Sequence, residues 1–177
     1  MDIRQLLVFG GICLFAPWAI AEQTDRYQVQ YPAQVTYVVD GDTIYACDHN
    51  QHIHKLRLAN IDAPELYQAY GEKSKMALKE DILNQHVWVK RRSFDQYHRE
   101  VVDIFYHGQD INLTQVANGN AYVYVYFAKR YLSERQQKIY YQAEVKARIN
   151  KIGLWGDKPA IAPWGSVSYT HLTLPTS

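Results

Sequence analysis

Acidic residues stand at two places where the chain is expected to turn. The segment DGDT (residues 40–43) lies between apolar runs, and Asp-Gly in that setting is a strong β-hairpin signal. Asp62 follows an apolar run, and Pro64 biases Ala63 toward an extended conformation that directs its carbonyl oxygen. Two carboxylates and a carbonyl are hard oxygen donors of the kind that bind Ca²⁺ or Mg²⁺. Taken singly, each aspartate is equally explained by turn capping or strand termination.

Two arginines have the chemistry to bind a phosphate beside these carboxylates. Arg57 lies between two leucines, so it points away from the core if the leucines point into it. Arg99 is two positions from Tyr97, which places a guanidinium beside an aromatic ring. The planar guanidinium matches phosphate oxygens in a bidentate manner, and fixed cations stabilise the charge that develops in phosphoryl transfer. The alternative for either arginine is a surface ion pair, which contributes little.

Aromatic and basic residues add a possible nucleic-acid surface. The segment AYVYVYF (residues 121–127) alternates, which predicts a β-strand with Tyr122, Tyr124 and Tyr126 on one face. Bases could stack on that face, although good strand formers on a solvent-facing sheet explain it equally well. Five basic side chains attract a nucleic-acid backbone or belong to solvated turns: Lys90, Arg91, Arg92, Lys129 and Arg130.

The elements that position these residues follow from hydrophobic periodicity. Strands are predicted within residues 27–40, 43–48, 52–61, 86–94 and 100–107, in addition to 121–127. Helices are predicted over residues 71–83 and 110–118, the second with Gly119 as its stop. A third begins at a capping box of Ser133 and Gln136 and runs to Ile152, with Gly153 as its stop. This order predicts an α+β fold, a five-stranded OB-like β-barrel with about three packed helices, and such barrels commonly bind nucleic acids.

The chain as a whole is consistent with one exported domain. It has 177 residues and a formal net charge of +1, so no strong overall electrostatic attraction to nucleic acid is indicated. Residues 1–21 read as a signal peptide, with a basic start, an apolar stretch and an Ala-x-Ala cleavage site. Cys47 is then alone in the mature chain, which excludes an intramolecular disulfide. The uncharged Ser/Thr-rich residues 165–177 are interpreted as a non-native or disordered tail.

Three motifs in this order resemble the thermonuclease, or staphylococcal (micrococcal) nuclease-like, family. They are DGDT at residues 40–43, RLANIDAPE at residues 57–65 and DQYHR at residues 95–99. The resemblance covers residues 34–155, nearly all of the domain predicted at residues 22–164. It implies the staphylococcal-nuclease fold. One departure is His98, which stands where many relatives have glycine; because histidine does not require a positive φ, the turn there is expected to differ slightly.

The resemblance also implies roles for individual residues. Asp42, Asp62 and the Ala63 carbonyl would hold Ca²⁺, with Thr43 as a local support. Glu65 would be the general base that activates water; the alternative explanation of its position is an acid placed favourably at a helix N-terminus. The residues expected at the scissile phosphate and at the bound nucleotide are Arg57, Arg99, Tyr97 and Tyr124.

These roles lead to an expected function. The protein would be an exported Ca²⁺-dependent endonuclease that hydrolyses DNA and RNA with little sequence preference and leaves 3′-phosphate ends. We expect it to be secreted or periplasmic, monomeric, and without stable membrane association after signal cleavage. The alternative is a non-catalytic nucleic-acid-binding barrel, which predicts that some catalytic positions would be replaced; the acids and both arginines are all present.

Overall fold

The computed structural model describes residues 29–156 of the chain. The predicted signal peptide (1–21) and tail (165–177) lie outside the described residues, as do residues 22–28 and 157–164 of the predicted domain. The strands are β1 (Val29–Val38), β2 (Thr43–Asp48), β3 (Ile53–Leu58), β4 (Ile61–Asp62), β5 (His86–Phe94), β6 (Glu100–Tyr106), β7 (Gln109–Asp110) and β8 (Tyr122–Val123). The helices are α1 (Gly71–Ile82), α2 (Ile111–Ala117), α3 (Val125–Tyr131), α4 (Glu134–Ile149) and the 3-10 turn η1 (Gly153–Trp155).

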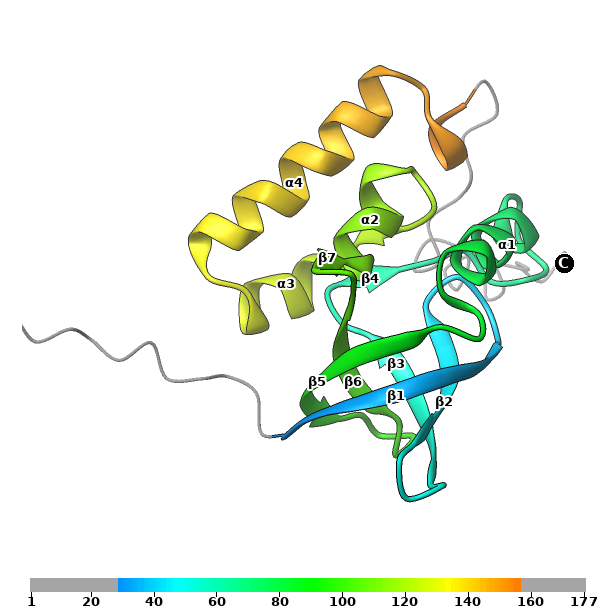
Figure 1. Ribbon diagram of the computed structural model, residues 1–177. Helices are drawn as coiled ribbons and strands as arrows, with labels where there is room; N and C mark the ends of the chain where they lie inside the picture. Colours follow the sequence, from blue (N-terminus) through cyan, green and yellow to red (C-terminus); the bar gives the residue numbers. More distant parts are fainter. Residues whose placement is uncertain (1–28, 157–177) are drawn as a thin grey trace, which may run out of the picture.

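Five of the strands close into a barrel (Figure 1). Their order is β3-β2-β1-β5-β6, and β6 pairs in parallel with β3 to complete the circle. The other barrel pairings are antiparallel, as expected for strands joined by hairpins. The predicted five-stranded OB-like barrel is therefore confirmed. Closure leaves the long strands with few unpaired edges.

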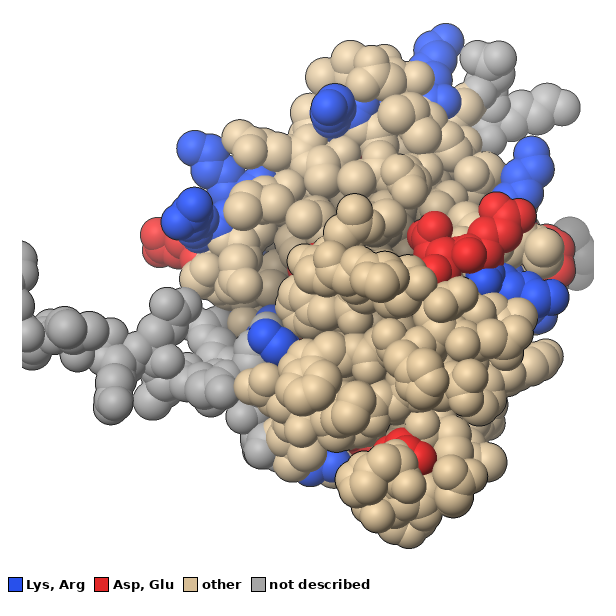
Figure 2. Space-filling model, in the orientation of Figure 1, with Lys and Arg blue, Asp and Glu red and all other residues tan. Residues whose placement is uncertain are grey.

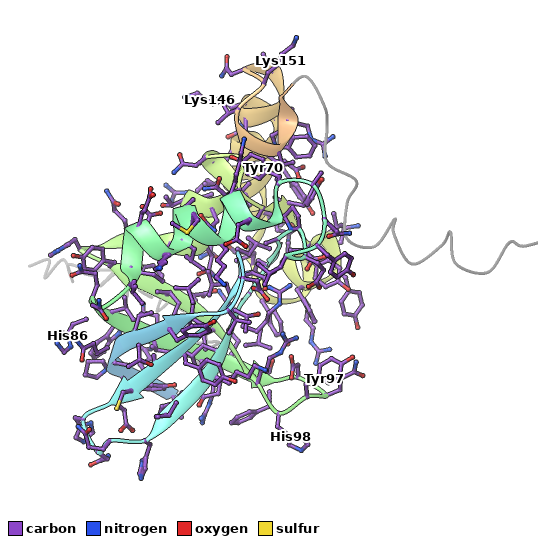
Figure 3. The ribbon with its side chains drawn as sticks, turned by 90° about the vertical axis from the view of Figure 1, so that its right-hand side faces the viewer. Tyr70, His86, Tyr97, His98, Lys146 and Lys151 are labelled. Atoms are coloured by element: carbon purple, nitrogen blue, oxygen red, sulfur yellow. The ribbon has the colours of Figure 1, made fainter. Side chains whose placement is uncertain are left out.

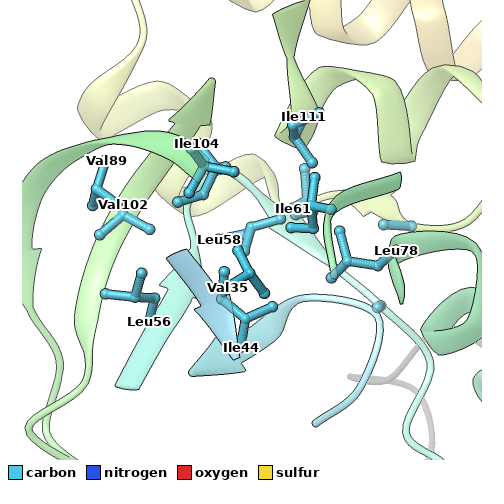
Figure 4. Packing of buried hydrophobic residues seen from close by; sticks show 14 of the residues in the cluster. Val35, Ile44, Leu56, Leu58, Ile61, Leu78, Val89, Val102, Ile104 and Ile111 are labelled. Carbon is cyan, nitrogen blue, oxygen red and sulfur yellow. The ribbon is translucent and has the colours of Figure 1, made fainter. Parts of the chain in front are cut away.

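The barrel interior is filled by the inward-facing residues of alternating strands. On β3, Leu56 and Leu58 are fully buried whereas Arg57 between them reaches the outside, as the alternation predicts. Branched and aliphatic side chains from all five barrel strands meet those of the helices in one cluster (Figure 4). The labelled members are Val35, Ile44, Leu56, Leu58, Ile61, Leu78, Val89, Val102, Ile104 and Ile111.

The helices cover one end and one side of the barrel (Figure 1). The longest, α4, lies beyond α2 and α3, which separate it from the barrel strands. The described chain thus contains four α-helices, where the sequence predicts about three. The additional helix is α3, and it begins inside a segment predicted to be a strand.

That segment, residues 121–127, is where the sequence prediction is wrong. Only β8 is a strand, and it pairs with β4, which is itself two residues long. The Tyr124 N–H donates to the Asn60 carbonyl (2.8 Å), and α3 then begins at Val125. An alternating pattern yields a long strand only where a partner strand extends beside it, and β4 offers none beyond Asp62. Tyr122, Tyr124 and Tyr126 therefore do not share one face: the first is buried, the second half-buried and the third exposed.

Helix α4 begins as predicted and ends earlier. The capping box is present, with the Ser133 side chain accepting from the Gln136 N–H and the Gln136 side chain accepting from the Ser133 N–H. The helix ends at Ile149, because Lys151 adopts a left-handed φ of 51° and turns the chain away. Gly153 starts η1 instead of stopping α4.

Candidate active site

The first part of the site is the turn between β1 and β2. The Asp40 side chain accepts a hydrogen bond from the Asp42 N–H (3.0 Å), which is the turn role expected of it. Gly41 packs so closely that a Cβ atom there would lie 1.8 Å from Ser74 Oγ and 2.6 Å from Ala63 Cβ. Glycine at this position therefore lets the turn sit directly against α1 and the segment after β4.

Asp42 is the buried carboxylate that this turn presents. Its Oδ1 accepts from Thr43 Oγ1 (3.0 Å), and its Oδ2 accepts from the Ala63 N–H (2.8 Å). Arg57 Nη2 lies 3.1 Å from the same Oδ2. Burial raises the pKa of Asp42 to about 7, although the Arg57 charge lowers it.

Arg57 connects Asp42 to Asp62. Its Nη2 also contacts Asp62 Oδ1 at 2.7 Å, and its Nη1 donates to the carbonyls of Leu58 (2.8 Å) and Ile61 (3.0 Å). The guanidinium is held by backbone and carboxylates together. Burial raises the pKa of Asp62 as well, opposed by Arg57 and reinforced by the Glu65 charge.

Arg99 is held at the end of the β5–β6 hairpin. Its Nε donates to Asp95 Oδ2 (2.7 Å), while Asp95 Oδ1 accepts from the backbone N–H groups of Tyr97 and Arg99 (2.9 Å each). Arg99 Nη1 reaches Thr43 Oγ1 at 3.4 Å, which joins this hairpin to the Asp42 turn. The guanidinium carbon lies 5.5 Å from the centre of the Tyr97 ring, the neighbourhood predicted from their spacing.

Tyr97 and His98 stand at the tip of that hairpin, the end of β5 opposite to His86 (Figure 3). His98 has a φ of 60°, in the left-handed region. Histidine does not require a positive φ, but it adopts one at this position. Histidine adopts this conformation more readily than branched residues do, so the turn keeps a shape that suits glycine.

A cleft of about 490 Å³ lies between the β5–β6 hairpin, α3 and residues of β3 and β4, and Asp42 is not among the residues that line it. Arg57 and Asp62 line it on the barrel side, and Tyr97 and Arg99 line it on the β5–β6 hairpin. Tyr124 also lines it, although as the N-cap residue of α3 and not as part of a strand. The other lining residues are Ser93, Phe94, Asp95, Gln96, Val101, Phe127, Arg130 and Tyr131.

Of the five basic side chains considered for backbone attraction, one lines this cleft and one is buried. Arg130 is exposed at the cleft. Arg92 is buried, with Nε donating to Asp103 Oδ2 (2.8 Å) and Nη1 donating to the Tyr131 carbonyl (2.7 Å). Arg92 is thus a structural ion-pair residue and not part of a solvated turn.

Glu65 lies on the exposed loop between β4 and α1. Its N–H donates to Gln68 Oε1 (2.7 Å), and its carbonyl accepts from the Gln68 N–H (2.8 Å). Gly71, at the start of α1, holds the loop in place, since a Cβ there would lie 1.9 Å from the Glu65 carbonyl oxygen. Glu65 does not line the cleft, but it is close enough for its charge to act on Asp62.

A buried polar network behind the turn was not anticipated from the sequence. Gln115 of α2 donates from Nε2 to the Gly41 carbonyl (2.9 Å) and accepts from Asn120 Nδ2 (3.0 Å). Ser74 of α1 donates to the Asn120 carbonyl (2.7 Å). Ser74 and Gln115 are polar residues inside predicted helices, and nothing in the sequence marked them as buried.

The donor set around Asp42 suits a hard cation. Within residues 29–156 no group of three or more His, Cys, Asp or Glu side chains is arranged to hold a metal ion, so a site here would need backbone and water oxygens as well. Two carboxylates that converge on one guanidinium nitrogen in a buried setting have raised pKa values, and a divalent cation would oppose that shift. Oxygen donors without thiolate or imidazole favour Ca²⁺ or Mg²⁺.

Fold and cleft together define a small α+β barrel protein whose arginines and carboxylates converge where a phosphate would bind. The chain matches the family described as Staphylococcal nuclease homologue over residues 55–157. It is 35% identical over 151 residues to an uncharacterized endonuclease of Haemophilus influenzae, with 81% of each chain covered. It is 34% identical over 143 residues to a micrococcal nuclease of Shigella flexneri, with 76% of this chain and 79% of the relative covered.

The chain belongs to the staphylococcal nuclease family. It is a hydrolase that acts on phosphodiester bonds, and nucleic acid is its class of substrate. The alternative of a non-catalytic binding barrel is therefore set aside.

Proposed function

We propose that the protein is an exported, Ca²⁺-dependent endonuclease that cleaves DNA and RNA with little sequence preference and leaves 3′-phosphate ends. The observation that carries the proposal is Arg57, which touches Asp42 and Asp62 at once at the edge of the cleft that Arg99 lines. These charged groups suit a phosphate, which every nucleotide carries, more than the edge of one particular base. Tyr97 and Tyr124 offer ring faces that any base can use.

Asp42, Asp62 and the Ala63 carbonyl would hold the cation, and water and a substrate phosphate would complete its shell. Bound Ca²⁺ would polarise the phosphoryl oxygens and neutralise charge that develops on them. Both aspartates are already oriented by Arg57, and the Ala63 N–H fixes one Asp42 oxygen. Arg57 Nη2 contacts both aspartates, so a bound cation would replace these contacts and free that nitrogen for the phosphate.

Arg57 and Arg99 would hold the non-bridging oxygens of the scissile phosphate from two sides. Asp95 and Thr43 orient Arg99, and the Leu58 and Ile61 carbonyls orient Arg57. Charges fixed before the reaction stabilise the transition state without reorganisation.

Glu65 would accept a proton from the attacking water as the P–O5′ bond breaks, and the departing O5′ would take a proton from solvent, which leaves a 3′-phosphate and a 5′-hydroxyl end. Its exposed position beside Asp62 is compatible with a base that acts on a solvent-derived nucleophile. The water attacks in line with the departing oxygen, and the protein contributes mainly positioning.

Export rests on the signal peptide predicted at residues 1–21, which leads us to propose a secreted or periplasmic location. Weak Ca²⁺ sites suit the higher calcium of such compartments. Among residues 29–156, none of the helices has the length and apolar character needed to span a membrane. A monomer is proposed because Asp42, Asp62, both arginines and Tyr97 all come from one chain.

The test is digestion of plasmid DNA and of RNA by the purified protein in millimolar Ca²⁺, in Mg²⁺ and in chelator. We expect cleavage of both polymers with Ca²⁺, none with chelator, and 3′-phosphate termini by end-group analysis. Absence of cleavage in Ca²⁺ would overturn the proposal, and 5′-phosphate ends would overturn the assigned bond.

A further inference from the structure

The outer face of the barrel beside the catalytic cleft carries a group of aromatic and basic side chains. We define the tyrosine–lysine patch as Tyr37 of β1, Tyr45 of β2, Lys55 of β3 and Lys75 of α1. The Tyr37 and Tyr45 ring centres are 6.4 Å apart. Lys75 Nζ lies 5.8 Å from the centre of the Tyr37 ring, and Lys55 Nζ lies 5.7 Å from that of Tyr45. Four residues from four elements thus form two adjacent cation–aromatic pairs.

The patch continues the row of residues that begins in the active site. In the β2–β3 ladder, Thr43 pairs with Arg57 and Tyr45 pairs with Lys55. Residues two apart on a strand share a face, so Lys55 follows Arg57 on the outside of β3, about 7 Å along the strand.

The chemistry of the patch fits a polymer of bases and phosphates. Tyr37 is 54% exposed although it pairs with Tyr45 in the β1–β2 ladder. Tyrosine faces stack with bases of any sequence, and ammonium groups attract the phosphates between them. Lys79 lies one helical turn after Lys75 on α1 and adds a further positive charge on the same face.

We propose that the tyrosine–lysine patch binds a single-stranded segment of the nucleic acid whose scissile phosphate occupies the cleft. This inference rests on the proposed function of the cleft and extends it to the polymer outside it. Bases would stack on Tyr37 and Tyr45, and phosphates would contact Lys55 and Lys75. Long substrates would therefore be bound more tightly than short ones that fill the cleft alone.

The first measurement is binding of a fluorescent single-stranded oligonucleotide in chelator, where no hydrolysis is expected. Tyr37→Ala should weaken binding about fivefold or more through loss of base stacking. The double variant Lys55→Gln/Lys75→Gln should reduce the slope of log affinity against log salt by about 1.4, since each phosphate contact to a single strand contributes about 0.7.

The matched control removes the same charge elsewhere. Lys138→Gln/Lys146→Gln changes two exposed lysines of α4, which α2 and α3 separate from the barrel strands (Figure 1). This control should keep the affinity and the salt slope of the unmodified protein. If both double variants reduce the salt slope equally, the effect is one of general charge, and the proposal that the tyrosine–lysine patch binds nucleic acid is overturned.

The second measurement separates the patch from the cleft. The ratio of KM for a trinucleotide to KM for a long single-stranded polymer should fall about fivefold or more in the Tyr37→Ala variant, because only the long polymer reaches the patch. An unchanged ratio together with unchanged oligonucleotide affinity would overturn the patch while leaving the proposed nuclease activity intact. Failure of the unmodified protein to cleave either substrate would overturn the proposed function, and the binding measurement would still decide the patch.

Discussion

The Asp42 carboxylate accepts two hydrogen bonds and forms one ion pair, with partners that belong to different parts of the chain. Thr43 belongs to β2, the Ala63 N–H follows β4, and Arg57 belongs to β3. A carboxylate held in this way has little rotational freedom, which is what a rigid cation site requires. The residues of the site could be named from sequence motifs, but these donors could not, because the contacts depend on packing between distant segments.

Glu65→Gln should lower kcat by roughly 10²- to 10⁴-fold, since the amide cannot accept the proton of the attacking water. Because Glu65 is exposed, unfolding free energy should change by no more than about 0.5 kcal/mol. The measurement is plasmid cleavage beside a thermal melt, with Glu72→Gln on the adjacent α1 as the matched control. Near-normal cleavage by the Glu65→Gln variant, in a preparation free of other nucleases, would refute the base assignment.

At the scale of elements, the site depends on how two hairpins are supported by helices. The bounds of β2 and β5 are those predicted from the sequence, because strong strand formers end there at turn residues. The Asp95 turn and the capping box of α4 are local features, so they too were within reach of the sequence. Helix α3 could not be predicted from the sequence. It begins where it does because β4 is only two residues long and offers no partner to the residues after β8. The hydrogen bond from Gln115 of α2 to the Gly41 carbonyl is also a tertiary contact, so it could not be predicted from the sequence either.

Replacing Gln115 by methionine tests that support. The variant keeps the side-chain volume but leaves the Gly41 carbonyl and Asn120 Nδ2 without this partner in a buried setting. We expect a loss of about 1–3 kcal/mol in unfolding free energy and a fall in kcat/KM, as the Asp42 turn loosens.

The matched control is Gln137→Met, which removes an amide hydrogen bond to the Leu132 carbonyl at the start of α4. It should lower stability by about 1 kcal/mol and keep kcat/KM. Denaturant titration and steady-state kinetics on both variants give the comparison. Equal kcat/KM for both proteins would show that Gln115 contributes only to stability.

At the scale of the whole molecule, charges are spread without a dominant sign. Figure 2 shows basic and acidic side chains in small separate groups on a mostly uncharged face, which agrees with the net charge of +1. Substrate binding therefore depends on the local arrangement of charges more than on the overall electrostatic field.

Polar contacts also hold the helical layer together beside the barrel. One of them involves Asp110, which caps α2 and accepts from Tyr140 Oη of α4 at 2.9 Å.

Burial raises the pKa of Asp110 to about 6, and the Asp103 charge adds to this, while the Leu113 N–H and Tyr140 oppose it. The folded pKa lies above the ordinary value of 3.8, so the folded protein binds the proton more tightly. The resulting stability is fully present below about pH 4 and is lost as pH rises through about 6. Asp110→Asn removes this dependence while it preserves an N-cap side chain.

Between about pH 4 and pH 7, we expect the Tm of the unmodified protein to fall by several degrees relative to the Tm of Asp110→Asn. Thermal melts of both proteins across that range provide the measurement. A constant difference would show that Asp110 does not titrate in this range.

The parallel pairing of β3 with β6 has a consequence for how activity is acquired. Arg57 belongs to β3 and Arg99 borders β6, and the pairing of these two strands, which are far apart in sequence, closes the barrel. Joining ends so distant costs chain entropy before any contact is gained. The two arginines line one cleft only in a chain in which β3 and β6 have paired, so we expect activity to require a closed barrel.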